Sequence, residues 1–261
     1  MRFRIYPYAM YSMSSRDLSK KLREHGFDCL RVYPDGEYLP RRDDVIINWG
    51  NSRVPGWWWR EHGTFLNLPA AVERSINKIN SFSILQQANV TTPLFTTNIE
   101  QAREWATDRE SPIVVCRTLV SAHAGRGIVI ALTPDEIVEA PLYTKHVRHK
   151  REFRVHVFKG RVIDFTEKKK ASDGRPVTSE YVRNHDGGWA FCRNYVTLPE
   201  DCAQQAINAV KALCLDFGAV DIAYREREDK AFVLEVNTAP GFDIESTTLK
   251  RYLTAFINEV V

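Results

Sequence analysis

The sequence predicts a mixed α/β (α+β) fold, and three patterns support this prediction. Strand-like and helix-like segments alternate over the first third of the 261-residue chain, as in a small α/β unit. Farther on, glycine-bearing and charged turns join consecutive strand-like segments, which is typical of hairpins. With 44% hydrophobic and 26% charged residues, the chain is also able to bury a sizeable core.

Composition narrows the function classes. The net charge of +3 suits an anionic ligand such as a nucleotide but falls short of a nucleic-acid-binding signature. The five cysteines are odd in number and form no C-x-x-C pair, so we expect reduced thiols and no zinc site. No apolar run reaches the roughly 18 residues of a membrane helix, and the polar start lacks the apolar core of a signal peptide. We therefore expect a soluble, cytoplasmic protein with no membrane partner.

The first third predicts three strands and one helix that ends at Gly26. In open α/β sheets ligands gather at the carboxyl ends of strands, so the loops YAMYSMSS and NWGNSR are candidate substrate loops. The alternative is that Asn48 and Asn51 only shape a turn and that Trp57–Trp59 only pack against the next domain. The predicted elements are strands near Arg2–Tyr6, Asp28–Tyr33 and Asp44–Gly50 and a helix over Ser15–His25.

The middle of the chain predicts one long helix and a glycine-bearing hairpin. The helix covers Ala70–Asn89, and the hairpin loop lies within Arg117–Ala131. Because this loop joins two strands, it differs from a Walker loop or a dinucleotide fingerprint, both of which need a helix N-terminus. Its backbone N–H groups could still cover a phosphate, although glycine is common in ordinary hairpins. Other predicted elements are a strand at Leu94–Phe95, a helix at Ile99–Thr107 and a strand at Pro112–Cys116.

The segment Leu142–Lys170 predicts three strands. In the second of them Glu152, Arg154 and His156 alternate with apolar residues, so all three face one side of a sheet. A solvent-exposed polar face is the common structural alternative for a single strand. The polar stretch Ala171–Cys192 is a long connection of a kind that tends to be functional or disordered. The last predicted elements are a helix at Glu200–Leu215, strands at Gly218–Glu226 and Lys230–Thr238, and a helix from Thr247.

Two carboxylates and one carboxamide lie on the last two strands. Side chains alternate along a strand, so Glu235 and Asn237 share one face while Leu234 and Val236 share the other. A hairpin would bring Asp221 to Glu235 and Asn237, giving hard oxygen ligands for Mg²⁺ or Mn²⁺. The alternative is a pair of strand acids matched by Arg or Lys. The glycine hairpin and the basic sheet favour a metal with a triphosphate.

Several segments resemble one family, in its order along the chain. VLEVNTAPGFDIES resembles the C-terminal signature of the ATP-grasp ligases, most closely the RimK-type ligases, which add glutamate to a ribosomal protein. NKINSFSILQQANVTTP resembles the entry helix of the nucleotide domain, and RTLVSAHAGRGIVI the flexible glycine loop. EFRVHVFKGRVID resembles the central arginine strand, and VRNHDGG the substrate-side loop. The match covers roughly Ser75 to the C-terminus; the opening is similar to phage-encoded ATP-grasp proteins.

The resemblance implies an ATP-grasp fold in which two α+β subdomains clasp ATP. Residues 1–74 would form an N-terminal pre-ATP-grasp α/β substrate domain. Residues 75–141 would form the central subdomain with the glycine loop, and residues 142–261 the C-terminal subdomain with the metal site.

The resemblance also implies the roles of individual residues. The metal ligands would be Asp221, Glu235 and Asn237. The residues at the reacting phosphate or acyl phosphate would be Arg154, with Arg183 and Asn184 near it. Lys78 and Arg117 would hold the ATP phosphates, the loop from Ser121 to Gly127 would close over them, and the strand Tyr143–Val147 would supply backbone contacts to adenine. The full nucleotide-binding set is Lys78, Arg117, Ser121, His123, Gly125, Gly127, Tyr143, Lys145, Val147, Glu152 and Lys168.

Four positions depart from the family pattern. Arg117 stands where the family usually has Lys, which keeps the charge and adds a fork able to grip two phosphate oxygens. His123 and Ala124 make the flexible loop poorer in glycine. Lys145 stands where the RimK group often has Glu, which bears on the contact to the adenine amino group.

The implied activity is that of an ATP-dependent carboxylate–amine ligase that works through an acyl phosphate and releases ADP and phosphate. Its cofactors would be ATP and two Mg²⁺ or Mn²⁺ ions, and its partners a small carboxylate such as an amino acid and an amine acceptor such as a peptide or protein. Nucleic acid is expected only as a modified-base substrate. Two other classes stay open: a kinase on the same scaffold, and a nucleic-acid-binding protein that uses Glu167–Lys170 and the tryptophans. A phage-encoded protein would act in the host cytoplasm.

Overall fold

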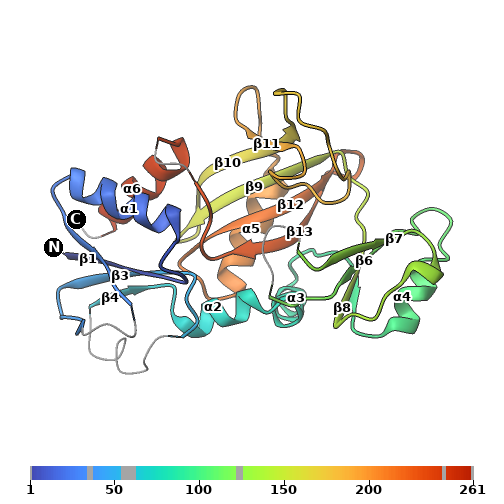
Figure 1. Cartoon of the computed structure of the whole chain (residues 1–261), viewed down its shortest axis with the longest axis horizontal. Coiled ribbons are helices and arrows are strands. Elements are labelled where there is room, and N and C mark those ends of the chain that lie inside the picture. Colours follow the sequence, from blue (N-terminus) through green and yellow to red (C-terminus); the bar gives the residue numbers. More distant parts are fainter. Residues whose placement is uncertain (1, 34–37, 54–62, 122–125, 243–244, 260–261) are drawn as a thin grey trace.

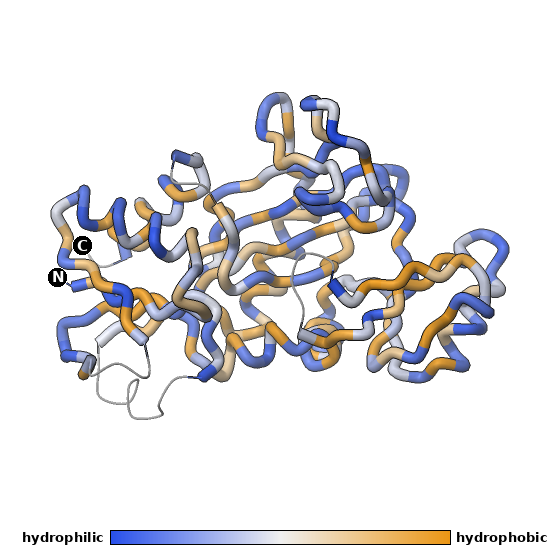
Figure 2. Tube along the Cα trace, in the orientation of Figure 1, coloured by the Kyte–Doolittle hydropathy of each residue, from blue (hydrophilic) through white to orange (hydrophobic). Residues whose placement is uncertain are grey.

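The computed structural model describes residues 2–33, 38–53, 63–121, 126–242 and 245–259. Three β-sheets lie side by side along the long axis of the molecule, and helices pack against them, so the mixed α/β (α+β) prediction is confirmed (Figure 1). Hydrophobic residues follow the strands of the sheets, whereas the helix nearest the N-terminus is largely hydrophilic (Figure 2). Among the described residues, no helix combines the length and the apolar character needed to cross a bilayer.

The N-terminal sheet is parallel and has the strand order β2-β1-β3-β4. The three strands predicted in this region are present, and β4 is an additional short strand. Leu18 and Leu22 of α1 contribute to the core of this unit. The elements are β1 (Arg2–Pro7), α1 (Met13–Glu24), β2 (Asp28–Arg31), β3 (Asp44–Trp49) and β4 (Thr64–Leu66).

The smallest sheet is antiparallel, with the order β5-β8-β6-β7, and it has a core of its own. The predicted hairpin is present as β6 and β7. Strand β8 belongs to this sheet although it follows the proposed boundary at residue 141, so the strand pairing favours a boundary after Lys145. The elements are β5 (Phe95–Thr96), α4 (Ile99–Trp105), β6 (Val114–Arg117), β7 (Ile128–Ala131), the 3₁₀ helix η1 (Pro134–Glu136) and β8 (Leu142–Lys145).

The prediction of one helix over residues 70–89 is wrong, because the chain breaks at Asn77 into α2 (Pro69–Ile76) and α3 (Lys78–Gln87). Asn77 has an extended backbone, and its side-chain oxygen accepts hydrogen bonds from the amides of Ile79 and Asn80. This is the geometry of a helix N-cap. The break makes Lys78 the first residue of a new helix.

The largest sheet is antiparallel, with the order β11-β10-β9-β12-β13, and α5 covers one of its faces (Figure 1). Its core includes Phe153, Val155 and Val157 of β9, so the residues between them face away from α5. The elements are β9 (Arg151–Phe158), β10 (Arg161–Lys170), β11 (Trp189–Cys192), α5 (Glu200–Ala212), β12 (Phe217–Arg225), the 3₁₀ helix η2 (Glu226–Glu228), β13 (Lys230–Asn237) and α6 (Thr247–Asn258).

A β-bulge interrupts the pairing of β12 with β13. Asp221 pairs with Glu235 and Ile222 pairs with Val233, which leaves Leu234 as the extra residue. The bulge resets the alternation of side chains, so both Val233 and Val236 enter the core under α5. Strict alternation correctly places Glu235 on the opposite face but does not anticipate this change of phase.

The N-terminal sheet and the largest sheet share one hydrophobic core. Trp49 is fully buried, stacks on Phe217 at a centroid distance of 5.4 Å, and meets Tyr252 of α6 edge-on at 5.6 Å. Asn67 also joins the two units: its carboxamide donates to the carbonyl of Phe217 at 2.9 Å and accepts from the amides of Asp216 and Phe217. These contacts fix the end of β3 and the residue after β4 beside the start of β12.

Candidate functional site

Charged side chains gather on the face of the largest sheet that α5 leaves uncovered. Arg154, Asp221 and Glu235 occupy paired positions on β9, β12 and β13. The guanidinium of Arg154 donates two hydrogen bonds to the Asp221 carboxylate, at 2.7 and 2.8 Å. Strand register therefore places Glu235 and Asp221 in one row with Arg154 of β9.

Lys168 of β10 extends this row of charges. Its ammonium donates to Glu152 at 2.5 Å and to Asp221 at 3.1 Å, and all three side chains are buried. Burial raises the pKa of the Asp221 carboxyl, but Arg154 and Lys168 outweigh it and hold that pKa far below its usual value. Burial likewise opposes ionisation of Glu152, and Lys168 and His149 hold its pKa below the usual value. Both carboxyl groups are thus anionic across the physiological pH range.

Two cations reach β13 from the middle of the chain. The ammonium of Lys78, at the start of α3, donates to Glu235 at 3.2 Å. The guanidinium of Arg117, at the end of β6, is buried, which lowers its pKa, while the charge of Glu235 raises it. Residues beside the glycine loop contact the helix break, since the Lys78 amide donates to the Val120 carbonyl at 3.2 Å and Ser121 donates to the Ile76 carbonyl at 3.4 Å. The helix break at Asn77, the residues beside the glycine loop and β13 therefore lie close together.

Asn237 completes the set of oxygen donors. Its Nδ2 atom is buried and has no hydrogen-bond partner among the described residues, so this N–H group can still donate to a ligand. The described residues contain no cluster of three or more His, Cys, Asp or Glu side chains suited to a metal. Two carboxylates and one carboxamide oxygen nevertheless form the hard donor set that Mg²⁺ accepts, with water or phosphate filling the remaining positions. The residues fit a magnesium ion that is bound together with phosphate.

A hollow of about 330 Å³ lies at the other end of this face, where β8 leads into β9. Glu152 is beside it, because His149 and Arg183 of its lining lie 3.2 and 3.8 Å from the Glu152 carboxylate. Burial lowers the pKa of His146, also in the lining, to about 4, so this ring is neutral. The lining consists of Glu110, Ser111, Pro112, Ile113, His146, Arg148, His149, Glu180, Tyr181 and Arg183.

The strand expected to contact adenine, Tyr143–Val147, ends at this hollow. The side chain of Tyr143 belongs to the core of the small sheet, and that of Lys145 donates to Asp108 at 2.5 Å. The amides of Lys145 and His146 donate to the carbonyls of Leu94 and Ile113, so they are already engaged. Any base contact of this strand that uses an amide would come from another residue, such as the buried Val147.

The remaining predicted residues occupy loops. Arg183 donates to the carbonyls of His149 and Lys150 and stacks on Trp189 at 4.6 Å, which ties it to the Glu152 end of the face. The side-chain oxygen of Asn184 accepts from the Gly187 amide at 2.6 Å and shapes the loop. Gly127 has a φ of 72° and closes the β6–β7 turn against Leu119. His123 and Gly125 lie outside the described residues, as does Trp57–Trp59.

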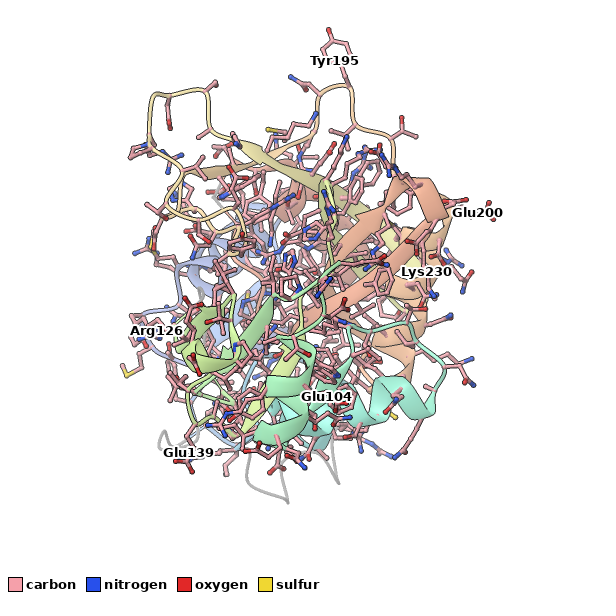
Figure 3. All side chains as sticks on the ribbon, turned by 90° about the vertical axis from the view of Figure 1, so that its right-hand side faces the viewer. Glu104, Arg126, Glu139, Tyr195, Glu200 and Lys230 are labelled. Atoms are coloured by element: carbon pink, nitrogen blue, oxygen red, sulfur yellow. The ribbon has the colours of Figure 1, made fainter. Side chains whose placement is uncertain are left out.

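Sequence analysis missed the aromatic strand β11. Phe191 places its ring 4.7 Å from the guanidinium carbon of Arg154 and 5.8 Å from the Lys168 ammonium, which are cation–π distances. Trp189 and Phe191 are two residues apart, and both stack on basic side chains, so the pattern W-x-F near the run of lysines was the available signal. Tyr195, in contrast, is fully exposed and points away from the molecule (Figure 3).

The front loop after β1 lies beside the end of β13. Gly50 has a φ of 82°, and a Cβ atom placed on it would lie 2.7 Å from Ala239 and 3.6 Å from the Cβ of Tyr8. Ala239 follows Asn237 by two residues. The loop exposes four large apolar side chains within six residues, namely Tyr8, Met10, Tyr11 and Met13.

Comparison with known proteins identifies the fold. No protein-family model and no curated protein sequence matches the chain. D-alanine–D-alanine ligase from Bacillus anthracis is similar over 98% of this chain and 93% of its own, with a TM-score of 0.67 and 14% identity. ATP-grasp ligase PsnB, complexed with minimal precursor, Mg and ADP, is similar over 99% and 97%, with a TM-score of 0.70 and 15% identity.

This chain has the ATP-grasp fold. A third similar structure is the macrocyclase MdnC bound with precursor peptide MdnA from Microcystis aeruginosa MRC, which matches over 100% of this chain and 99% of its own, with a TM-score of 0.69 and 15% identity. Because the matches run over nearly the whole of both chains, the N-terminal sheet is part of the shared ATP-grasp architecture.

Proposed function

We propose that this protein is an ATP-dependent carboxylate–amine ligase. The observation that carries the proposal is the buried face on which Asp221 and Glu235 alternate with Arg154, Lys168 and Lys78. Anionic metal ligands interleaved with cations are what a bound metal–triphosphate requires, and such a site works by positioning and charge neutralisation. The ATP-grasp ligases among the similar structures support the same chemistry.

The reaction would proceed in two steps. A carboxylate oxygen of the acid attacks the γ-phosphorus, the bond from that phosphorus to the bridging oxygen breaks, and ADP leaves with the electron pair. The amine nitrogen then attacks the acyl carbon, phosphate leaves, and the surplus proton of the amine passes to water. Arg154, held flat against Phe191, would stabilise the negative charge of the transferring phosphoryl group. Lys78 and Arg117 would bind the outer phosphates.

The metal would be held by Asp221, Glu235 and Asn237. When bound, Mg²⁺ neutralises phosphate charge and orients the phosphate oxygens. The hollow beside Glu152 is the proposed site of the base and ribose, since it lies at the far end of the same face from the N-terminal sheet.

The acceptor is proposed to be a peptide or protein that approaches over the front loop. Met10 is 70% exposed and Tyr11 is 81% exposed, in the same loop as Tyr8, which lies near Gly50 and Ala239 after the end of β13. Clusters of exposed apolar side chains mark binding surfaces. The similar structures of PsnB and MdnC are complexes with precursors. A RimK-like relationship, a phage origin and a cytoplasmic location belong to the same proposal and rest on the sequence segments and the five free cysteines.

The decisive experiment is an ADP-release screen of amino acids against amines and peptides, with mass spectrometry of any hit. A ligase releases ADP and phosphate only when an acid and an amine are both present, and the product gains the mass of the acid minus water. A kinase would instead form a stable phosphorylated product, visible by ³¹P NMR. Absence of ADP release with every pair of substrates would contradict the proposal.

Replacing Met10 and Tyr11 with Ser is expected to raise the KM for a peptide acceptor about tenfold or more, because apolar contacts of roughly 1.5–3 kcal/mol each are lost. The affinity for Mg·ADP should stay unchanged, since neither side chain belongs to the charged face and both are exposed. A matched control is Leu39→Ser, which removes another exposed apolar side chain, in the connection between β2 and β3. Steady-state kinetics and calorimetry measure the two effects. An unchanged KM would show that the front loop is not part of the acceptor site.

A further inference from the structure

We propose that Arg74, together with the side-chain N–H group of Asn237, binds a carboxylate group of the acid substrate. The inference rests on the proposed ligase function and assigns a role to an arginine that the metal, phosphate and base sites leave unused. It starts from two nitrogen donors at one end of β13 that have no acceptor within the described ranges of the chain.

Arg74 lies in the last turn of α2 and is partly buried. Its Nε atom is shielded from solvent, and none of the residues that the structure describes accepts a hydrogen bond from it or forms an ion pair with the guanidinium. In contrast, Arg154 and Arg193 each donate two hydrogen bonds to a carboxylate. A guanidinium withdrawn from water without an acceptor gains most from an anion, and its Nε edge can form two parallel hydrogen bonds with a carboxylate.

The packing of α2 directs Arg74 to the charged face. Val72 and Ile76 pack into the core under α5, whereas Ser75 donates to a backbone carbonyl of β13 at 2.9 Å. Successive residues are about 100° apart around a helix, so Arg74 lies on the opposite side of Ser75 from these two core residues. Because the core covers one face of the largest sheet and Ser75 meets the edge of that sheet, Arg74 lies on the side of the other face, which is the charged one.

Arg74 lies level with Asn237 along the strand. Lys78 donates to Glu235, and Ser75, three residues earlier in the chain, donates to the next residue of β13. The chain of α2 therefore runs antiparallel to β13, and the residue before Ser75 lies beside the residues of β13 that begin with Asn237. The buried Nδ2 atom of Asn237 also has no hydrogen-bond partner in the part of the chain that the structure describes. The two donors thus lie close together, and both can donate to one anion.

The place of these donors along the charged face favours a carboxylate over a phosphate. The hollow proposed for the base lies at the Glu152 end of the face, and a lysine proposed for the phosphates reaches Glu235. Asn237 lies beyond Glu235, in the direction of Ala239 and the loop that follows β3. The acid has to approach the terminal phosphate from this side, so its carboxylate would meet the two donors.

Chemical modification of Arg74 by phenylglyoxal, followed by mass spectrometry of proteolytic peptides, tests the site without catalysis. Glutarate should slow this modification about fivefold or more. Its neutral diamide, glutaramide, and Mg·ADP should each leave the rate within about twofold of that in the protein alone. The internal reference is Arg103, which pairs with Glu100 on α4 and should react at the same rate in every sample. No protection by glutarate, or protection by Mg·ADP that equals or exceeds it, overturns the proposal.

Steady-state kinetics test the same role with the acid that the ADP-release screen identifies. Arg74→Gln should raise the KM for this acid about tenfold or more, because charge-assisted hydrogen bonds are lost, and should leave the KM for ATP within about twofold. A cation in the last turn of a helix also stabilises the helix dipole. Arg74→Lys separates the two roles: it keeps the charge and the melting temperature, but it lacks the fork, so the KM for the acid should stay raised about threefold or more.

An unchanged KM for the acid in Arg74→Gln, or a KM fully restored in Arg74→Lys, contradicts the carboxylate site even in a protein that is a ligase. Protection of Arg74 by glutarate in a protein that never releases ADP would keep the site and refute the proposed ligase activity. Arg103→Gln is the matched control, since it removes a surface arginine of α4, and its KM values and melting temperature should equal those of wild type.

Discussion

Glu235→Gln and Asn237→Ala are each expected to lower the rate of ADP production at least about 100-fold, the usual cost of removing one group that stabilises charge in the reaction. Glu235 loses the charge that a metal on the triphosphate needs, and Asn237 loses its donor oxygen. Both variants should remain folded, because Glu235 is 30% exposed and the Asn237 carboxamide has an unpartnered Nδ2 among the described residues.

The measurement is a coupled ADP assay at saturating ATP and magnesium, with circular dichroism to verify folding. Glu228→Gln is the matched control, since Glu228 lies in the turn between the same two strands and pairs with Arg225 at the surface. Its activity should equal that of wild type. Wild-type ADP production in either site variant would refute the assignment of Asp221, Glu235 and Asn237 to the metal.

Asn67→Ala is expected to destabilise the protein by about 3–5 kcal/mol, an unusually large effect for one polar side chain. Asn67 is fully buried, and the substitution strips partners from the amides of Asp216 and Phe217 and from the Phe217 carbonyl. Each buried group left unsatisfied costs about 1–3 kcal/mol. The φ of 61° at this position adds strain for alanine.

Urea denaturation measures this loss, and Asn67→Gly separates its two causes. Glycine loses the same hydrogen bonds but accepts the left-handed backbone, so it should recover about 1 kcal/mol relative to alanine. Asn208→Ala, which removes a hydrogen bond with Gln204 on the surface of α5, should stay within about 0.5 kcal/mol of wild type. A loss below about 1 kcal/mol in Asn67→Ala would show that the hydrogen bonds of Asn67 do not hold the two units together.

Local patterns in the sequence predict the parts of the site that depend on strand periodicity. The shared face of Glu152, Arg154 and His156 follows from alternation, and so does that of Glu235 and Asn237. Alternation fails at Leu234, because a bulge depends on how two strands pair and leaves no local signature. The helix break at Asn77 could have been predicted, since Asn is a preferred N-cap residue. The helical pattern on both sides of Asn77 led instead to the prediction of one continuous helix.

The partners in the ion pairs of the charged face could not be predicted, because they lie far apart in the chain. Lys78 and Glu235 are 157 residues apart, and Arg154 and Asp221 are 67 residues apart. Only strand order and the position of α3 bring them together. The same holds for Asn67, whose role depends on a backbone 150 residues away and whose own sequence context is that of an ordinary loop.

The distribution of hydrophobic cores divides the molecule mechanically. Phe3 and Ile5 of the N-terminal sheet share a hydrophobic core with Phe217 and α6, so these parts form one packed unit. The small sheet has a separate core around Cys116 and Tyr143, and residues 146–150 connect it to β9. A closing movement over the charged face would therefore be a movement of the small sheet relative to the rest of the molecule. The hydrogen-bonded pair of Lys78 and Glu235 lies where the small sheet would meet the charged face.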